Sequence, residues 1–294
     1  MADGAAGPDP TVHRRRLRNE LRKARETAQM TQRDVAAAMD WSQSKLIRIE
    51  TGAVNISTND LRALLNHYGV EQAKIVSMVE LARSAREQTK WNIYRDVAAP
   101  EYIAFCGYES SASVIRNFEP ILIPGLLQTE EYARSVVSTF EANSPHRIDS
   151  LVDLRMQRQE IVTLDNPPSL HFVIDESVIR REVGGAEITR RQLKHLLELS
   201  EYPNVTIRIM PFSQGMYPRM RSPYVHFEFP AAEDEDILYL ESPARGDIIR
   251  ESSPEETEEV NPVIYLGIFW QLEQLAPKEE FRGKVEQRLA DLER

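Results

Sequence analysis

The chain has 294 residues, of which 41% are hydrophobic, and its formal net charge is −10. This length can hold two domains, and this apolar content is enough for packed cores. No apolar run approaches the roughly 18 residues that a membrane-spanning helix needs, so we expect no membrane association. The single cysteine, Cys106, excludes an internal disulfide and favours a cytoplasmic location.

The N-terminal residues 1–12 are rich in Gly, Pro, Asp and Ala. They contain no apolar segment ahead of the basic cluster that follows, so they do not form a signal peptide. We predict a disordered tail here. A helix is predicted next, over about 13–28.

Charge is divided unevenly along the chain. Residues 1–90 contain 15 Lys or Arg and 11 Asp or Glu, a balance of +4, whereas residues 91–294 contain 21 and 35, a balance of −14. The basic excess is concentrated around the first helix, in Arg14, Arg15, Arg16, Arg18, Arg22, Lys23 and Arg25. Because phosphate contact needs a local basic patch rather than a basic chain, nucleic-acid binding is expected in the N-terminal part only.

Residues 30–52 have the pattern of a helix-turn-helix. Thr31 and Ser42 can cap two helices, Gln32–Met39 and Gln43–Glu50, on either side of a short break at 40–42. Gly52 ends the second helix. The apolar sides of the two helices are formed by Val35, Ala36 and Met39 and by Leu46, Ile47 and Ile49.

The second helix turns four polar side chains outward, and these are Gln43, Ser44, Lys45 and Arg48. A recognition helix places such residues against base edges in the major groove. Gln can pair with adenine, Arg or Lys can pair with guanine, and Ser can bond a base edge or a phosphate. The alternative is an ordinary polar face on a small helical hairpin.

The sequence of this segment resembles the XRE family of DNA-binding domains, which includes the phage Cro and C1 repressors. The matching residues are TQ at 31–32, VA at 35–36, SQS at 42–44 and IETG at 49–52. The resemblance implies that Gln32 braces against Gln43 and a phosphate, and that Arg25 pairs with Glu50. The family usually has Gly in the turn, where this chain has Asp40. Asp tolerates the left-handed conformation better than most residues, so we expect the turn to form.

Two more helices complete the predicted domain over 13–88. Ser57 can cap a fourth helix that Gly69 ends, and a fifth is predicted over about 71–88. The fold class of this part is therefore an all-α, five-helix DNA-binding domain.

The remaining residues, 91–294, mix helices and strands. Helices are predicted over about 104–117, 150–164 and 188–200, from Thr129 onward, and over the last roughly 35 residues, with Ile264, Leu266, Phe269, Leu272 and Leu275 on one face. Strands are predicted at 170–174, 205–210, 224–229, 237–240 and 248–249. This is an α+β domain with a mainly antiparallel sheet.

Three segments of this second part, at 123–137, 171–185 and 203–212, resemble the C-terminal domain of WhiJ-like or antitoxin-like actinobacterial regulators. The resemblance implies a small partner protein encoded nearby, bound as an antitoxin binds a toxin.

An enzyme is not expected, because no familiar catalytic, nucleotide-binding or zinc motif is present, and neither a metal nor a cofactor is predicted. The nearest cluster, His171, Asp175, Glu176 and Ser177, is interpreted as a strand that ends in a polar helix cap.

Cys106 is interpreted as a buried structural thiol, since no basic neighbour in the sequence lowers its pKa. The turn at 123–129 is interpreted as core, with a partner groove as the alternative. The acidic run 251–259 is interpreted as a solvated loop, with a dock for a basic partner as the alternative.

We therefore predict a sequence-specific transcription regulator that binds double-stranded DNA, with a C-terminal domain that receives a partner protein or a ligand. One such domain makes a small interface, so a homodimer on two half-sites is expected. The alternative is an antitoxin-like interaction module whose DNA binding is lost or secondary.

Overall fold

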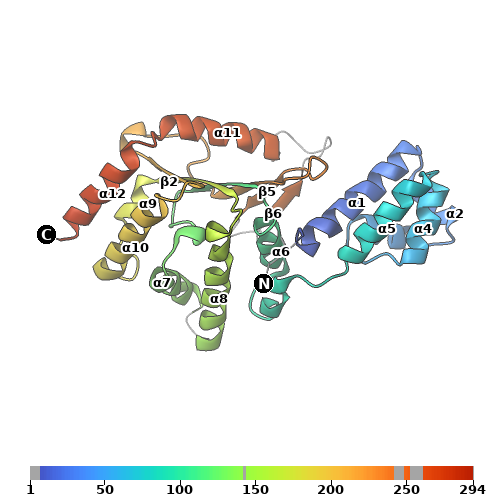
Figure 1. Cartoon of the computed structure of the whole chain (residues 1–294), viewed down its shortest axis with the longest axis horizontal. Helices are drawn as coiled ribbons and strands as arrows, with labels where there is room; N and C mark the ends of the chain where they lie inside the picture. Colours follow the sequence, from blue (N-terminus) through green and yellow to red (C-terminus); the bar gives the residue numbers. More distant parts are fainter. Residues whose placement is uncertain (1–6, 142–143, 242–247, 252–260, 294) are drawn as a thin grey trace. The chain divides into compact units, whose positions relative to one another are not determined.

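The computed structural model describes residues 7–141, 144–241, 248–251 and 261–293, and the chain divides into two compact units, Met1–Asn92 and Ile93–Arg294 (Figure 1). Half of the predicted tail, residues 1–6, lies outside the described residues, as does the acidic run from 252 to 259. None of the described helices is long and apolar enough to cross a membrane.

The first unit consists of five α-helices, as predicted: α1 Pro10–Thr27, α2 Gln32–Ala38, α3 Gln43–Glu50, α4 Thr58–His67 and α5 Gln72–Ser84. Its core gathers apolar side chains from all five helices, among them Leu21, Val35, Leu46, Leu64 and Met78. Each contributing helix buries one stripe and leaves its polar side in solvent, the pattern of a small helical bundle.

The predicted tail is too long by three residues, because α1 begins at Pro10 rather than His13. Asp9 caps the helix by accepting a hydrogen bond from the Thr11 backbone N–H at 2.9 Å, and Val12 is buried. The prediction failed because it treated Pro10 as a tail residue, although Pro is well suited to the first position of a helix. The fifth helix also ends earlier than predicted, at Ser84.

The second unit is built around a six-stranded mixed sheet in the order β3-β2-β1-β4-β5-β6. Its strands are β1 Val114–Glu119, β2 Ser169–Asp175, β3 Val205–Met210, β4 Tyr224–Glu228, β5 Ile237–Leu240 and β6 Ile248–Glu251. The pairings among β1, β2 and β3 are parallel, and the three pairings on the other side of β1 are antiparallel. The α+β class and the mainly antiparallel sheet are thus confirmed.

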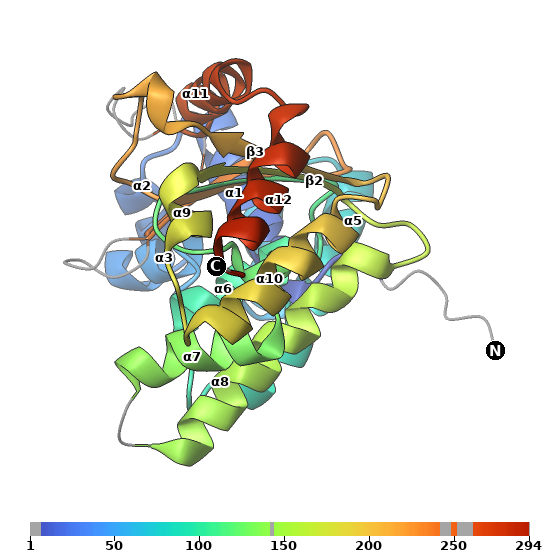
Figure 2. The ribbon, with the colours of Figure 1, turned by 90° about the vertical axis from the view of Figure 1, so that its left-hand side faces the viewer.

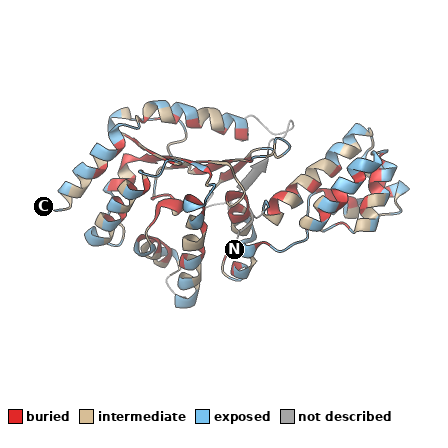
Figure 3. Ribbon diagram, in the orientation of Figure 1, coloured by how far each residue is buried: buried red, intermediate tan, exposed pale blue. Residues whose placement is uncertain are grey.

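Helices cover both faces of this sheet. On one side lies α11 Pro262–Leu275, and on the other lie α6 Pro100–Glu109, α7 Glu130–Phe140, α8 Pro145–Arg158 and α10 Ala186–Leu199 (Figures 1 and 2). Two further helices, α9 Glu176–Arg180 and α12 Glu280–Asp291, pack near β2 and β3. Buried residues concentrate between the sheet and the helices (Figure 3).

The helix predicted over 104–117 is correct only as far as Glu109, where α6 ends, and wrong over its last four residues, 114–117, which belong to the central strand β1. Ile115 and Phe118 are buried on opposite faces of the sheet, and β1 has a hydrogen-bonded neighbour on each side. Only these long-range partners, β2 and β4, distinguish the segment from a helix. The tertiary context therefore decided its structure.

The apolar face predicted for the last helices is also partly wrong. In α11 the buried residues are Pro262, Tyr265, Phe269 and Leu272, whereas Ile264 is 38% exposed. The helix is apolar on several sides, so its sequence did not indicate which side faces the sheet.

Candidate nucleic-acid interface

The helix-turn-helix forms through the two caps that the sequence predicts. Thr31 Oγ1 accepts a hydrogen bond from the Asp34 N–H, and Ser42 Oγ accepts one from the Lys45 N–H, both at 3.2 Å. Between the two helices Asp40 adopts a left-handed conformation with φ of 54°. The turn therefore forms with Asp where the XRE family usually has Gly.

The inner side of α3 is fixed in the core of the first unit. Leu46, Ile49 and Glu50 are buried, whereas Ile47, which was predicted to be on the apolar side, is 38% exposed. At 100° per residue, Ile47 follows Gln43 by one helical turn and shares its outward face. An apolar side chain on this face can contact the methyl group of thymine, so Ile47 is a candidate that the sequence interpretation missed.

Three of the predicted DNA-binding side chains, Gln43, Ser44 and Arg48, are exposed on the outward face of α3. Within the described part of the chain, these three side chains form no hydrogen bond or ion pair. Unpaired polar groups on a helix fixed from behind can meet base edges without first breaking intramolecular bonds. These three side chains are therefore free to bind DNA.

Lys45 is held differently from its neighbours. Its Nζ lies 3.1 Å from Asp60 Oδ2 and 3.8 Å from the centre of the Trp41 ring. Both residues of the ion pair remain about 40% exposed, so the pair adds little stability and can be exchanged for a phosphate contact.

Behind α3, a partly buried ion pair links the recognition helix to α1. Arg25 donates from Nε to Glu50 Oε1 at 2.7 Å and from Nη2 to Glu50 Oε2 at 3.2 Å, and Glu50 is 2% exposed. Burial opposes the charge on Arg25, but the Glu50 carboxylate outweighs it and raises the pKa of the guanidinium. The pair implied by the family resemblance is therefore present.

Gln32 also belongs to this buried cluster, in a role different from the expected one. Its Nε2 donates to Glu50 Oε2 at 2.7 Å, and no hydrogen bond joins Gln32 to Gln43 among the described residues. The carboxylate of Glu50 attracts the Gln32 amide more strongly than the neutral amide of Gln43 would. The expected brace between the two glutamines is thus replaced by one between Gln32 and Glu50.

A tyrosine hydroxyl lies close to the same carboxylate. Burial, and then the negative charge of Glu50, raise the pKa of Tyr68, so its hydroxyl stays neutral. The cluster therefore contains one negative and one positive charge, and both are hydrogen-bonded.

The basic residues of α1 do not form the single patch that was expected. Arg15 is 1% exposed, and Arg14 donates to the backbone oxygens of Ala85 and Glu87 at 2.8 and 2.7 Å. Arg14 thus connects α1 to the residues that follow α5. Arg33, in the first turn of α2, is an exposed cation that was not predicted to contact DNA, and the exposed Asp34 follows it in the same turn.

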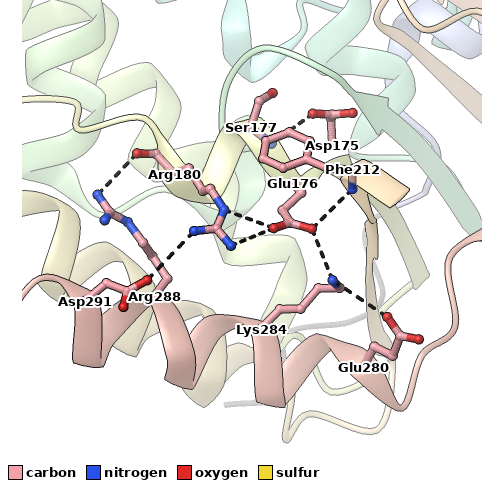
Figure 4. A network of polar contacts seen from close by, with 9 residues as sticks. All are labelled: Asp175, Glu176, Ser177, Arg180, Phe212, Glu280, Lys284, Arg288 and Asp291. Atoms are coloured by element: carbon pink, nitrogen blue, oxygen red, sulfur yellow. Dashed lines mark hydrogen bonds and ion pairs between the residues drawn. The ribbon is translucent and has the colours of Figure 1, made fainter. Parts of the chain in front are cut away.

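In the second unit, the cluster that most resembles a catalytic site lies around Asp175 and Glu176, and its side chains make structural contacts (Figure 4). Asp175 accepts hydrogen bonds from the Ser177 N–H at 2.8 Å and from the Tyr217 hydroxyl at 2.5 Å. Glu176 accepts from Arg180 and from Lys284 on α12. Burial opposes ionisation of Glu176, but these hydrogen bonds outweigh it and lower its pKa.

His171 lies apart from that network. Its Nδ1 is 3.5 Å from Glu273 Oε1 on α11. No group of three or more His, Cys, Asp or Glu side chains within the described ranges is arranged to hold a metal ion.

The segment at 123–129 is part of the core, as the sequence interpretation favoured. Leu126 and Leu127 are buried, and Gln128 is 2% exposed. Gln192 on α10 donates to the Leu127 oxygen and accepts from the Thr129 N–H, both at 2.7 Å. Cys106 is also fully buried.

Comparison with known families gives two matches. Residues 102–260 match the family described as Domain of unknown function (DUF5753), and residues 16–76 match a Helix-turn-helix domain. The first match covers just over half of the 294 residues. The chain belongs to the DUF5753 family. No curated protein and no solved structure matches it.

The second match covers α2 and α3 completely, so this DUF5753 protein is a DNA-binding regulator of the helix-turn-helix type. The DUF5753 region contains the whole six-stranded sheet but ends before α11 and α12. Those two helices extend beyond the part that defines the family.

Proposed function

We propose that the chain is a sequence-specific transcription regulator of XRE type and that it reads the major groove with α3. The observation that carries this proposal is the contrast between the two sides of the helix. Its inner side is fixed by Leu46, Ile49 and the Arg25–Glu50 pair, while Gln43 and Arg48 point outward and have no side-chain partner among the residues that the structure describes.

The roles follow from chemistry and position. Gln43 and Arg48 are assigned to adenine and guanine edges, and Ser44 to a base edge or a phosphate. Lys45 leaves Asp60 to contact a phosphate. Gln32 uses one amide proton for Glu50 and retains a second for the backbone of the DNA. These contacts hold the register of the helix in the groove, while the base contacts select the sequence.

The second unit is proposed to receive a signal, in the form of a small partner protein bound as an antitoxin binds a toxin, or of a ligand. Its net charge of −14 favours a protein partner over DNA, because DNA is itself negatively charged. A catalytic role is not proposed, because Asp175 and Glu176 are used by caps and by the contact with α12. A cytoplasmic location and a homodimer complete the proposal.

A selection from random duplex DNA tests the DNA-binding part. The full chain, incubated with the library at moderate salt, should enrich one motif, and that motif should occur twice in inverted repeat if a dimer binds. The variant Gln43→Ala, which leaves the inner side of α3 intact, should enrich a motif with relaxed choice at one position. Failure of the full chain to enrich any sequence would reject the assignment.

A further inference from the structure

Strand β1 carries two polar side chains on a face of the sheet that is otherwise apolar around them. Asn117 and Glu119 are two residues apart in β1, so both point to the face that α6, α7, α8 and α10 cover. Phe118, between them, packs on the other face under α11. In the neighbouring strand, Asn117 lies beside Phe172 and Glu119 beside Ile174, and both of these are buried.

Neither polar side chain has a partner in the part of the chain that the structure describes. The Oδ1 atom of Asn117 is shielded from solvent and accepts no hydrogen bond. Burial, and then the negative charge of Glu241, raise the pKa of Glu119 well above its usual value, and the nearby charge of Arg155 offsets this only in part. Shielding polar groups in this way is costly unless another group bonds to them.

Arg155 on α8 supplies a third group of this kind. Its Nη1 donates to Gln128 Oε1 at 2.8 Å, and Gln128 in turn donates to the Ile123 oxygen at 2.6 Å. These contacts hold the guanidinium in place, while its Nε is shielded from solvent and bonds to no described atom. An N–H on a cation that is already held in place favours an acceptor, and most strongly an anionic one.

The position of these groups in the sheet also favours a ligand. At β1 the parallel pairing with β2 meets the antiparallel pairing with β4. The chain passes from β1 to β2 on one side, whereas β4, on the other side, follows β3. Where connections diverge in this way, ligands of α/β sheets bind at the carboxyl ends of the strands. Asn117, Glu119 and Arg155 are all partly exposed, so solvent reaches this end of β1.

The chemistry of the three groups indicates the ligand. Asn117 Oδ1 requires a donor, the Glu119 carboxylate attracts a cation, and the Nε of Arg155 requires an acceptor. We propose that the end of β1 binds a small zwitterion of the α-amino acid class, with its ammonium on Asn117 and Glu119 and its carboxylate on Arg155. Such a ligand is the signal that the second unit receives in the proposed function, on which the inference rests.

Isothermal titration calorimetry of the full chain with each of the common α-amino acids tests this site. At least one amino acid should bind saturably, with one site per chain. The amine that lacks its carboxylate, and the acid that lacks its amino group, should each bind about tenfold more weakly or worse, because each loses a charge-assisted contact. This series uses only the wild type, so it decides even where a variant does not fold.

Two substitutions locate the site. Glu119→Gln keeps the size of the side chain and removes its charge, and Arg155→Lys keeps the charge and removes Nε. Each should weaken binding about tenfold or more. Glu101→Gln, at an exposed position of α6, is the control and should bind as the wild type does. Circular dichroism reports whether each variant is folded.

Failure of the folded wild type to bind any amino acid would overturn the site, and so would binding that survives both substitutions. Equal binding of the amine alone would overturn the zwitterion as the ligand. DNA binding is measured separately, by the selection described above. A chain that binds an amino acid but enriches no DNA sequence would reject the proposed function and leave the site standing, and a chain that enriches a sequence but binds no amino acid would do the reverse.

Discussion

Arg25 and Glu50 connect the end of α1 to the last residue of the recognition helix through two hydrogen bonds, of 2.7 and 3.2 Å. Glu50 also accepts from Gln32, so a single carboxylate links three helices. The orientation of α3 therefore depends on a polar contact in addition to apolar packing.

Replacing Glu50 by Ala should lower the free energy of unfolding of the first unit by about 3 kcal/mol, the low end of the range for a buried pair, because the partly buried Arg25 loses both hydrogen bonds to the carboxylate and keeps only the Met30 oxygen and the exposed Glu26. The matched control is Glu80→Ala, which removes an exposed partner of Arg83 and should cost less than about 1 kcal/mol. Urea denaturation followed by the helical circular dichroism signal measures both. Equal losses in the two variants would contradict the structural role of the pair.

A substitution in the turn between α2 and α3 should raise the stability of the first unit instead of lowering it. Asp40 is exposed and adopts φ of 54°, which costs a residue with a Cβ about 1 kcal/mol or more. Asp40→Gly should therefore stabilise the first unit by roughly that amount, and Asp40→Val should destabilise it. The melting temperature of the two variants decides the matter, and a lower value for the glycine variant would show that Asp40 makes a compensating contact.

Base reading is tested most directly at Arg48. On a selected operator, Arg48→Ala should weaken binding by about 1–3 kcal/mol if the side chain pairs with guanine. Binding to random DNA should change much less. Arg83→Ala, on an exposed face of α5, is the control for the loss of one positive charge. An equal loss on specific and random DNA would reduce Arg48 to a phosphate contact.

The sequence predicted the helix-turn-helix well because its signals are local. The Thr31 and Ser42 caps, the stop at Gly52 and the spacing of Val35, Leu46 and Ile49 all act within a few residues. The outward position of Gln43 follows from the same spacing.

What the sequence did not predict depends on distant partners. The strand β1 is recognisable only from its neighbours β2 and β4. The hydrogen bond from Gln32 to Glu50 could not be predicted, because the sequence does not show which oxygen atom lies near the Gln32 amide. The burial of Arg15 likewise depends on tertiary packing, which cannot be predicted from a run of basic residues in the sequence.

The second unit contains a buried histidine that should make its stability depend on pH. His226 is fully buried, and burial, followed by the Arg116 cation, lowers its pKa from 6.5 to about 4. Asp236 Oδ2 lies 3.4 Å from Nε2 and favours the charged ring, but complete removal of the ring from water outweighs one partly exposed carboxylate.

Because the pKa of His226 is lower in the folded chain, the unfolded chain binds the proton first as pH falls. The second unit should lose stability between pH 6.5 and 4, by on the order of 3 kcal/mol from this group alone. His226→Gln should flatten that part of the stability profile, whereas the same substitution at the exposed His146 is the control. Identical slopes for wild type and His226→Gln would rule the histidine out as the cause.

The last prediction concerns the division of labour between the two units. A fragment of residues 1–92 contains the +4 balance of residues 1–90 and every side chain assigned to DNA, and its core is its own. Once circular dichroism shows that it is folded, it should bind DNA, with an affinity that falls steeply as salt rises, since each phosphate contact releases a counterion. It should bind more weakly than the full chain if the second unit supplies the contacts of the proposed homodimer. Residues 93–294 alone should show no DNA affinity and should retain any partner protein. Gel shifts over a salt series measure both fragments, and DNA binding by the acidic fragment, or none by the folded basic one at low salt, would place the activity in the other unit.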